Sequence, residues 1–327
     1  MKKLFLLSSL LWLSLTATAE TGSFVYEFLQ LPTSVQAASA GGQTVSSPEC
    51  DLGLALHNPA CLNGEMHHTA QVGYLNYLAD IHFGQAIYSR KISELQSWMA
   101  AVRYLDYGEV EGADAYGRAT GTLPAKDMAL TGGYAFQLAD QWRGGINAHL
   151  IYSVLDSYTS LGMGVDLGVH YRDDGRGLWA GLAVKNLGAQ LIAYDDSHEA
   201  LPWDIQAGLT KQLEHAPFRF TLTAWGFNRL EHAYYGYDDS AEKWHQKALK
   251  HLLIGVDIVP ADNFQIYLGY NYRRRLELAV EQRSLLSGMS AGFSLNVKKV
   301  RIGASYAQYS AGGSSLQMSL ALDLNRL

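Results

Sequence analysis

From residue 71 to the end of this 327-residue chain, apolar and polar side chains alternate in recurring short segments. In residues 163–171, for example, Met163, Leu167 and Tyr171 share one face, whereas Asp166 and His170 share the other. A period of two is that of a β-strand, and a tilted strand of about ten residues crosses a bilayer. The pattern predicts membrane strands with one apolar and one polar face. A soluble sandwich with one buried face would show the same alternation.

Three further features favour a closed barrel. The segments number about fourteen, and bacterial barrels have an even number of strands. Tyr and Trp cluster at the segment ends, where their rings suit the interface between membrane and water. Short connections alternate with long ones, as short periplasmic turns alternate with long outer loops in such barrels. The predicted strands are residues 71–77, 83–89, 97–107, 129–138, 143–152, 163–171, 178–187, 203–213, 218–226, 251–259, 264–272, 288–297, 300–308 and 315–324. We expect an all-β, closed antiparallel transmembrane β-barrel with both termini in the periplasm.

The amino terminus predicts export. Lys2 and Lys3 precede an apolar run at 4–15, and Ala17-Thr18-Ala19 is a small-residue cleavage site. This is the pattern of a secretory signal peptide; an N-terminal anchor is the alternative, although a spanning helix needs about 20 apolar residues. The net charge of −6 argues against a nucleic-acid partner. The expected domains are a signal peptide at residues 1–19, a segment at 20–70 and the barrel at 71–327.

The segment at residues 20–70 lacks the alternation and is too apolar to lie free in the periplasm. Small residues dominate residues 37–47, which include Gly41 and Gly42, and an apolar stretch precedes Asn58-Pro59-Ala60. Asn before Pro predicts a turn, because Pro fixes its own φ and disfavours the helical region for the residue before it. We expect this segment to fold into the barrel mouth as a hatch, with these five residues as its motif.

The motif Asn58-Pro59-Ala60, ahead of fourteen predicted strands, resembles the hatch of the FadL superfamily of outer-membrane barrels. Longer matches run through the chain in the expected order and are similar to the PorQ family of the type IX secretion system. They include Phe28-Leu29-Gln30-Leu31-Pro32, Ala40-Gly41-Gly42, Lys185-Asn186-Leu187-Gly188 and Gly269-Tyr270-Asn271-Tyr272-Arg273-Arg274-Arg275.

This resemblance implies an outer-membrane anchor without catalytic residues in the surface attachment complex. The family is associated there with a PorZ-like surface protein, alongside a PorU-like sortase and a PorV-like barrel. The complex processes cargo and joins it to anionic lipopolysaccharide. The rival function is a FadL-like transporter of hydrophobic small molecules. Polar side chains at positions predicted to face the lumen argue against that rival: Asn147, His149, Asp166, Arg219, Thr221 and Gln317.

Three groups of residues are candidate sites, each with a plain alternative. Arg273, Arg274 and Arg275 at the outer rim could pair with lipopolysaccharide phosphates, or form a solvated loop base. The longest loop, residues 227–250, could dock a partner through its aromatic residues or fold over the barrel mouth. Those aromatic residues are Tyr234, Tyr235, Tyr237 and Trp244.

The cysteines, Cys50 and Cys61, flank the hatch motif. They could form a disulfide that closes a short loop and stabilises the fold by up to about 3 kcal/mol, or remain two buried free thiols.

We expect no enzyme, cofactor or metal. Residues 240–243 fit the S-x-x-K pattern of penicillin-binding enzymes but have no K-T-G partner. His67 and His68 lack a third ligand at metal spacing. The inward carboxylates Asp166, Asp257 and Asp323 are predicted one to a strand, as a wet lumen requires.

Overall fold

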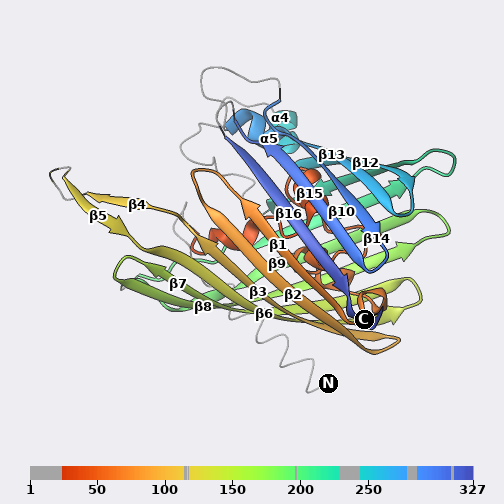
Figure 1. Cartoon of the computed structure of the whole chain (residues 1–327), viewed down its shortest axis with the longest axis horizontal. Helices are drawn as coiled ribbons and strands as arrows, with labels where there is room; N and C mark the ends of the chain where they lie inside the picture. Colours follow the sequence, from red (N-terminus) through yellow and green to blue (C-terminus); the bar gives the residue numbers. More distant parts are fainter. Residues whose placement is uncertain are drawn as a thin grey trace.

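The computed structural model describes residues 24–113, 116, 118–195, 197–227, 244–277, 286–310 and 313–326. Fourteen strands form a closed barrel whose first and last strands, β1 and β16, are hydrogen-bonded to each other (Figure 1). The prediction of a closed antiparallel barrel of about fourteen strands is confirmed. The predicted signal peptide, residues 1–19, lies outside the described residues.

The barrel strands, in chain order, are β1 (Thr69–Asn76), β2 (His82–Ser93), β3 (Gln96–Asp106), β6 (Ala125–Ala139), β7 (Trp142–Leu155), β8 (Tyr158–Asp173), β9 (Leu178–Ile192), β10 (Asp204–Gln212), β11 (Phe218–Ala224), β12 (Leu252–Ala261), β13 (Phe264–Asn271), β14 (Met289–Val297), β15 (Val300–Gln308) and β16 (Ser314–Asp323).

Two further strands lie outside the barrel. β4 (Val110–Ala113) and β5 (Ala119–Leu123) pair only with each other, in a ribbon that projects beyond the barrel wall (Figure 1). The sequence predicts a loop here, because the segment lacks the alternation of the barrel strands. Pro124 separates β5 from β6, since proline has no N–H to donate to a strand ladder.

The wall has the two faces that the alternation predicts. On β8, Met163 and Leu167 face outward and remain 49% and 39% exposed, whereas Asp166 and His170 face inward and are 1% and 4% exposed. Large apolar side chains are exposed in the same way on the outward face of the other barrel strands, for example Leu150, Leu182 and Leu268. An apolar outer face is what contact with lipid requires.

The two ends of the barrel differ. Short turns join β2 to β3, β6 to β7, β12 to β13 and β14 to β15 at one end, called here the short-turn end. Long connections such as those between β9 and β10 or β11 and β12 lie at the other end, the long-loop end. In outer-membrane barrels short turns face the periplasm and long loops face outward.

The two ends of the described chain lie at opposite ends of the barrel. At the short-turn end, the amide of Leu324 donates to the carbonyl of His68 at 2.8 Å. Phe24 instead forms a β-bridge with Ala200 in the β9–β10 connection, at the long-loop end. The prediction that both termini face the periplasm is therefore wrong for the start of the described chain, because residues 24–68 run through the length of the lumen.

Residues 24–68, called here the hatch, form short helices inside the barrel (Figure 1). These are η2 (Glu27–Gln30), α2 (Val35–Ser39), α3 (Leu52–His57), η3 (Pro59–Cys61) and η4 (Gly64–Met66). Ser34 caps α2 and Asp51 caps α3, each accepting a hydrogen bond from a backbone amide in the first turn. α2 packs against β13 to β16, and η3 packs against β6 to β8.

The remaining helices lie outside the hatch: α4 (Trp244–Lys250), α5 (Tyr272–Glu277) and η8 (Leu324–Arg326). Within the described ranges, no helix is both long enough and apolar enough to cross a membrane.

Candidate functional site

The Asn58-Pro59-Ala60 motif lies against strands β7 to β9. Asn58 ends α3 and begins η3, and its Oδ1 accepts a hydrogen bond from the amide of Ala60 at 3.0 Å. Its Nδ2 donates to two carbonyls, that of Val45 in the hatch at 2.9 Å and that of Val169 in β8 at 3.2 Å. The motif therefore forms a turn and also ties the hatch to the barrel wall.

Glycines in the wall permit this close approach. A Cβ at Gly168 of β8 would lie 2.0 Å from Oδ1 of Asn58, and one at Gly181 of β9 would lie 1.9 Å from the carbonyl oxygen of Val45. A Cβ at Gly145 of β7 would meet the backbone of the motif at 2.4 Å. Real Cβ contacts are essentially never under 3.0 Å, so backbone-to-backbone packing requires glycine here. We call the motif and these three wall glycines the motif seat.

Gly41 and Gly42 turn the hatch after α2. Their φ angles of 99° and 119° lie in the left-handed region that other residues rarely adopt. Asn271 of β13 donates its Nδ2 to the carbonyl of Gly41 at 2.9 Å. A Cβ at Gly42 would lie 2.5 Å from Nη2 of Arg274. The backbone conformation therefore demands glycine at both positions of this turn.

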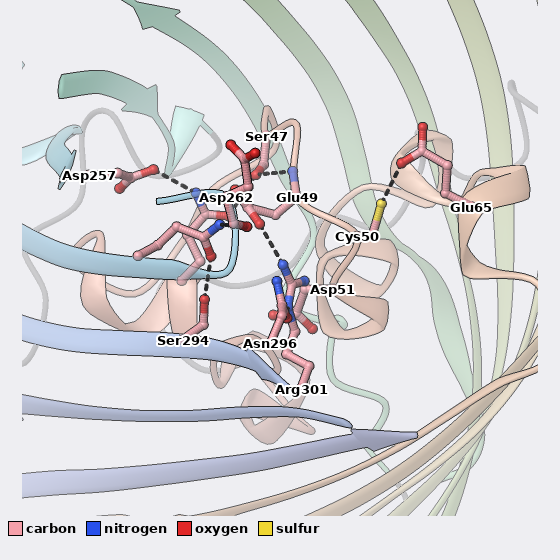
Figure 2. Close-up of polar contacts among 12 residues, drawn as sticks. Ser47, Glu49, Cys50, Asp51, Glu65, Asp257, Asp262, Ser294, Asn296 and Arg301 are labelled. Atoms are coloured by element: carbon pink, nitrogen blue, oxygen red, sulfur yellow. Dashed lines mark hydrogen bonds and ion pairs between the residues drawn. The ribbon is translucent and has the colours of Figure 1, made fainter. Parts of the chain in front are cut away.

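On the opposite side, five side chains form what we call the ionic cluster: Glu49 and Gln36 of the hatch, Arg219 of β11, Asp257 of β12 and Arg301 of β15. Glu49 accepts from Arg219 at 2.8 Å and from Arg301 at 2.6 Å, one bond to each carboxylate oxygen. Asp257 Oδ2 accepts from Nε2 of Gln36 at 2.9 Å and lies 3.4 Å from Arg219. Figure 2 shows Glu49 in the same group of side chains as Asp257 and Arg301. The carboxylate of Glu49 in the hatch thus forms ion pairs with two arginines of the barrel wall.

The ionic cluster is buried, with side chains of Glu49 and Arg219 only 8% and 6% exposed. Burial by itself would raise the pKa of Glu49, but the charges of Arg301 and Arg219 outweigh it and lower that pKa below its ordinary value of 4.5. Removing one partner of a buried pair costs about 3–5 kcal/mol, because the other charge is left uncompensated. Exposed pairs contribute about 0–1 kcal/mol. The ionic cluster is therefore a firm attachment of the hatch to the wall.

Asp51 joins two parts of the hatch to the first strand. Its Oδ1 accepts from the amide of Gly53 at 2.9 Å and from Nε2 of Gln71 in β1 at 2.7 Å. Its Oδ2 accepts from Oγ of Ser34 at 2.6 Å. Oε1 of Gln71 in turn accepts from the amide of Leu52 at 3.0 Å. One carboxylate therefore fixes the starts of α2 and α3 against β1.

An irregularity between β8 and β9 brings two consecutive polar side chains into the lumen. The register shifts between Val165 and Leu167, and Asn186 has a φ of 54°. Lys185 and Asn186 are both buried, as a β-bulge allows. Nζ of Lys185 donates to the carbonyl of Leu56 near the end of α3 at 2.7 Å. A positive charge at this end of a helix is favourable.

His57, at the end of α3, is held in its neutral form. Burial, with the positive charges of Lys185 and Arg103, lowers the pKa of His57 well below its ordinary value. Its Nε2 accepts from the amide of Thr33 at 3.2 Å, so its Nδ1 carries the proton and donates to Oε1 of Gln43 at 2.8 Å. The ring therefore connects three parts of the hatch by neutral hydrogen bonds.

His149 and Asp166 form a buried pair that the sequence does not predict. His149 Nε2 lies 2.8 Å from Oδ2 of Asp166, and its Nδ1 lies 2.9 Å from Oγ1 of Thr131. Asp166 Oδ1 also accepts from the amide of Asn186 at 2.7 Å, and Arg103 lies 3.3 Å from Nδ1 of the ring. Hydroxyl, imidazole and carboxylate stand in the order of a nucleophilic triad. All three are at most 4% exposed, however, so the group serves as a structural network that joins β6, β7 and β8.

The predicted wet lumen is wrong at these positions. Asp166 and Asp257 are each 1% exposed, because the hatch fills the space beside them. Asn147 donates to a hatch carbonyl at 2.9 Å, and Gln317 does so at 3.2 Å. The hatch backbone has carbonyl groups that no strand or helix hydrogen bond satisfies. Polar side chains of the wall donate to these groups in the place of water.

The first part of the hatch is held differently. Val25, Tyr26, Phe28 and Leu29 are buried in one apolar cluster with Leu201 and inward side chains of five wall strands. Those wall side chains are Leu75, Phe83, Leu105, Ala129 and Ile151. Residues 24–31 therefore occupy the long-loop half of the lumen mainly by apolar contact.

Cys50 and Cys61 are free thiols in the structure, so the disulfide alternative is not realised. They have separate partners: Sγ of Cys50 donates to Glu65 at 2.7 Å, and Sγ of Cys61 faces the carbonyl of Val45 at 3.8 Å. Figure 2 shows the bond between Cys50 and Glu65. Burial, with the charge of Glu65, raises the pKa of Cys50 to about 12, and burial raises the pKa of Cys61 to about 12.

The three arginines after β13 point in different directions. Arg273 is only 6% exposed, and its guanidinium lies over the ring of Trp225 at 5.4 Å. Arg274 lies over the ring of Tyr309 at 4.1 Å and beside Gly42. Arg273 and Arg274 therefore each pack on an aromatic ring of the barrel. Arg275 bonds the hydroxyl of Tyr270 at 3.2 Å. Contact of the three arginines with lipopolysaccharide stays a prediction.

The other predicted site residues are less informative. Tyr234, Tyr235, Tyr237 and the S-x-x-K segment at 240–243 lie outside the described residues. Trp244 begins α4 and is 81% exposed, as a docking residue would be. In the part of the chain that the structure describes, no group of three His, Cys, Asp or Glu side chains is placed to hold a metal ion.

The fold is shared with solved outer-membrane barrels. The toluene transporter TodX of Pseudomonas putida matches with a TM-score of 0.54 at 12% identity, over 92% of this chain and 98% of that one. A FadL homologue from Pseudomonas aeruginosa matches with a TM-score of 0.53 at 11% identity, over 90% and 98%. The monoaromatic hydrocarbon channel CymD matches with a TM-score of 0.51 at 9% identity, over 92% and 97%.

These likenesses show the fold alone, and no family model and no curated protein matches the sequence. With its apolar outer face, the chain is a multi-pass β-barrel of the outer membrane with FadL-like architecture.

Proposed function

We propose that the chain is a closed outer-membrane anchor, whose external loops or rim hold a water-soluble partner at the cell surface. The observation that carries this proposal is the filled lumen: residues 32–47 and 51–62 of the hatch are buried without a break. The motif seat brings the hatch into contact with three wall strands, and the ionic cluster ties it to three more. A barrel filled in this way suits a positional role.

The sequence resemblance supplies a setting for such an anchor. Segments that carry the resemblance to the PorQ family also seat the hatch: Gly41 and Gly42 form its tight turn, Asn58 binds the wall, and Lys185 binds the end of α3. By this resemblance the partner is a PorZ-like surface protein, alongside a PorU-like sortase and a PorV-like barrel. The barrel would then belong to the attachment complex that joins cargo to lipopolysaccharide in the type IX secretion system.

Deletion of the gene tests the anchor. We expect the surface partner to appear in the culture medium and the cargo to remain unprocessed and unattached, and a plasmid copy of the wild-type gene to restore both. Normal attachment and normal retention of the surface partner in the deletion strain would contradict the proposal.

Transport of hydrophobic small molecules is the second candidate. The comparisons favour it over attachment, because TodX is described as a toluene transporter and CymD as a monoaromatic hydrocarbon channel. The apolar cluster around residues 24–31 also favours it, since an apolar ligand could take the place of that segment. Proteoliposomes that hold the purified barrel should then take up labelled toluene faster than empty liposomes. Uptake at the rate of empty liposomes, together with lost attachment in the deletion strain, leaves the anchor as the function.

A further inference from the structure

A polar pocket lies at the short-turn end of the barrel, between the hatch and strands β2, β6, β7 and β8. Its volume is about 500 Å³, within the range of about 300–1,000 Å³ typical of ligand sites. The hatch contributes Ser47, Cys61 and Asn63 to its lining, and residues of three short turns, Glu94, Asp140 and Asp174, also line it. By the orientation argued from the turns, this pocket faces the periplasm, away from the external loops.

Most charges in the pocket are already paired. Lys91 bonds Glu94 at 2.7 Å. Arg172 bonds Asp174 at 2.8 Å and lies 3.2 Å from Glu65. These pairs are part-exposed, and each cation has an acidic partner. With three acids for two cations they carry a net charge of −1, and Asp140 is a fourth acid in the lining.

Arg143 is different, because among the described residues it has no acidic partner. Its Nε donates to the carbonyl of Leu62 at 3.2 Å, and its Nη1 donates to Oε1 of Gln137 at 3.0 Å. Its Nη2 is buried without a hydrogen-bond partner, and so is Nε2 of His170, the residue opposite it on β8. His170 is only 4% exposed. Buried donors without acceptors are costly, and a guanidinium bonds a carboxylate most strongly through two parallel bonds.

We propose that this pocket binds the free carboxyl terminus of a peptide from the periplasm. The carboxylate takes the place of the Gln137 side chain and accepts from both terminal nitrogens of Arg143, with His170 as a further donor. Asn63 and Gln141, also in the lining, offer neutral amide side chains to the backbone of the residues that precede it. Because the site lies at the other end of the barrel, it is separate from the partner at the cell surface.

Calorimetric titration of the full chain in detergent, at neutral pH and low salt, tests the site. The probe is N-acetyl-trialanine with a free carboxylate, and the control peptide carries a carboxamide instead. We expect the free acid to bind at least tenfold more tightly than the amide. Arg143→Gln should weaken binding of the acid by at least tenfold. Arg176→Gln is the matched control, because Arg176 lies in a short turn at the same end, is 79% exposed and is not part of the lining.

Gln137→Glu is a second variant, and it keeps Arg143 in place. The carboxylate of Glu at position 137 should pair with Arg143 and so compete with the peptide. Binding of the free acid should weaken by at least tenfold. Three results would overturn the proposal: no binding of the free acid to the wild-type chain, equal binding of acid and amide, or unchanged binding in a folded Gln137→Glu variant.

Discussion

The motif seat and the ionic cluster hold opposite sides of the same hatch by opposite means. At the motif seat, the hatch touches the wall backbone directly because Gly145, Gly168 and Gly181 have no side chains. At the ionic cluster, long charged side chains of Arg219 and Arg301 reach across to Glu49. The motif seat therefore depends on the absence of Cβ atoms from the wall glycines, and the ionic cluster depends on complementary charges. Adding a methyl group should therefore break the seat, whereas removing a charge should break the cluster.

The largest effect is expected at the motif seat. Gly181→Ala places a Cβ 1.9 Å from a hatch carbonyl oxygen, and neither backbone is a flexible side chain that could move away. We expect the free energy of unfolding to fall by about 3 kcal/mol or more, measured by urea titration in detergent. Gly132→Ala is the control, because a Cβ there meets nothing within 4 Å. Equal stability of the two variants would show that the seat is not tightly packed.

A loss of similar size is expected at the ionic cluster. Glu49→Gln leaves Arg219 and Arg301 buried without the carboxylate that they share, so we expect about 3–5 kcal/mol of destabilisation. Glu94→Gln, whose side chain is 85% exposed, should leave the unfolding curve unchanged. If Glu49→Gln also left it unchanged, the cluster would not be an attachment of the hatch.

The two attachments should also differ in their dependence on pH. The folded-state pKa of Glu49 is depressed, so its contribution to stability is present above the ordinary value of 4.5 and is lost as the pH falls below it. The stability difference between wild type and Glu49→Gln should therefore shrink as the pH falls below 4.5. Gly181→Ala involves no titrating group, so its difference from wild type should not follow this profile. Parallel profiles for the two variants would contradict the assignment.

The smallest effect, a change in thiol accessibility, sharpens the comparison further. Cys50 follows Glu49 in the chain, and Cys61 ends the turn of the hatch motif, so each thiol reports on one attachment. Both have a pKa of about 12 and should resist maleimide in the folded wild type at pH 7.5. Mass spectrometry should show Cys61 labelled first in Gly181→Ala and Cys50 first in Glu49→Gln. A wild-type mass lower by two protons, restored by reduction, would instead reveal a disulfide.

The sequence predicts the barrel well because each strand carries its own evidence. Alternation places all fourteen strands, but it makes β8 too short at both ends, predicted at 163–171 and observed at Tyr158–Asp173. The β4–β5 ribbon is missed because its segment lacks the alternation.

The hatch contacts are much less predictable. The motif at Asn58 is visible as a turn, yet nothing local shows that Gly168, 110 positions away, must lack a side chain to receive it. Glu49 and Arg219 are likewise 170 positions apart. Inward positions can be assigned from alternation, but which of them meet the hatch depends on how it threads the lumen. The path of the hatch also explains why Asp166 is buried beside His149 and Asp257 beside Arg219.

Closure of the lumen is the claim on which anchoring depends, and conductance across a planar bilayer tests it most directly. The wild-type chain, reconstituted at neutral pH, should show no stepwise current, whereas Gly181→Ala or Glu49→Gln should produce openings as the hatch loosens. Stable open-channel currents from the wild-type protein would contradict a lumen sealed by its own hatch.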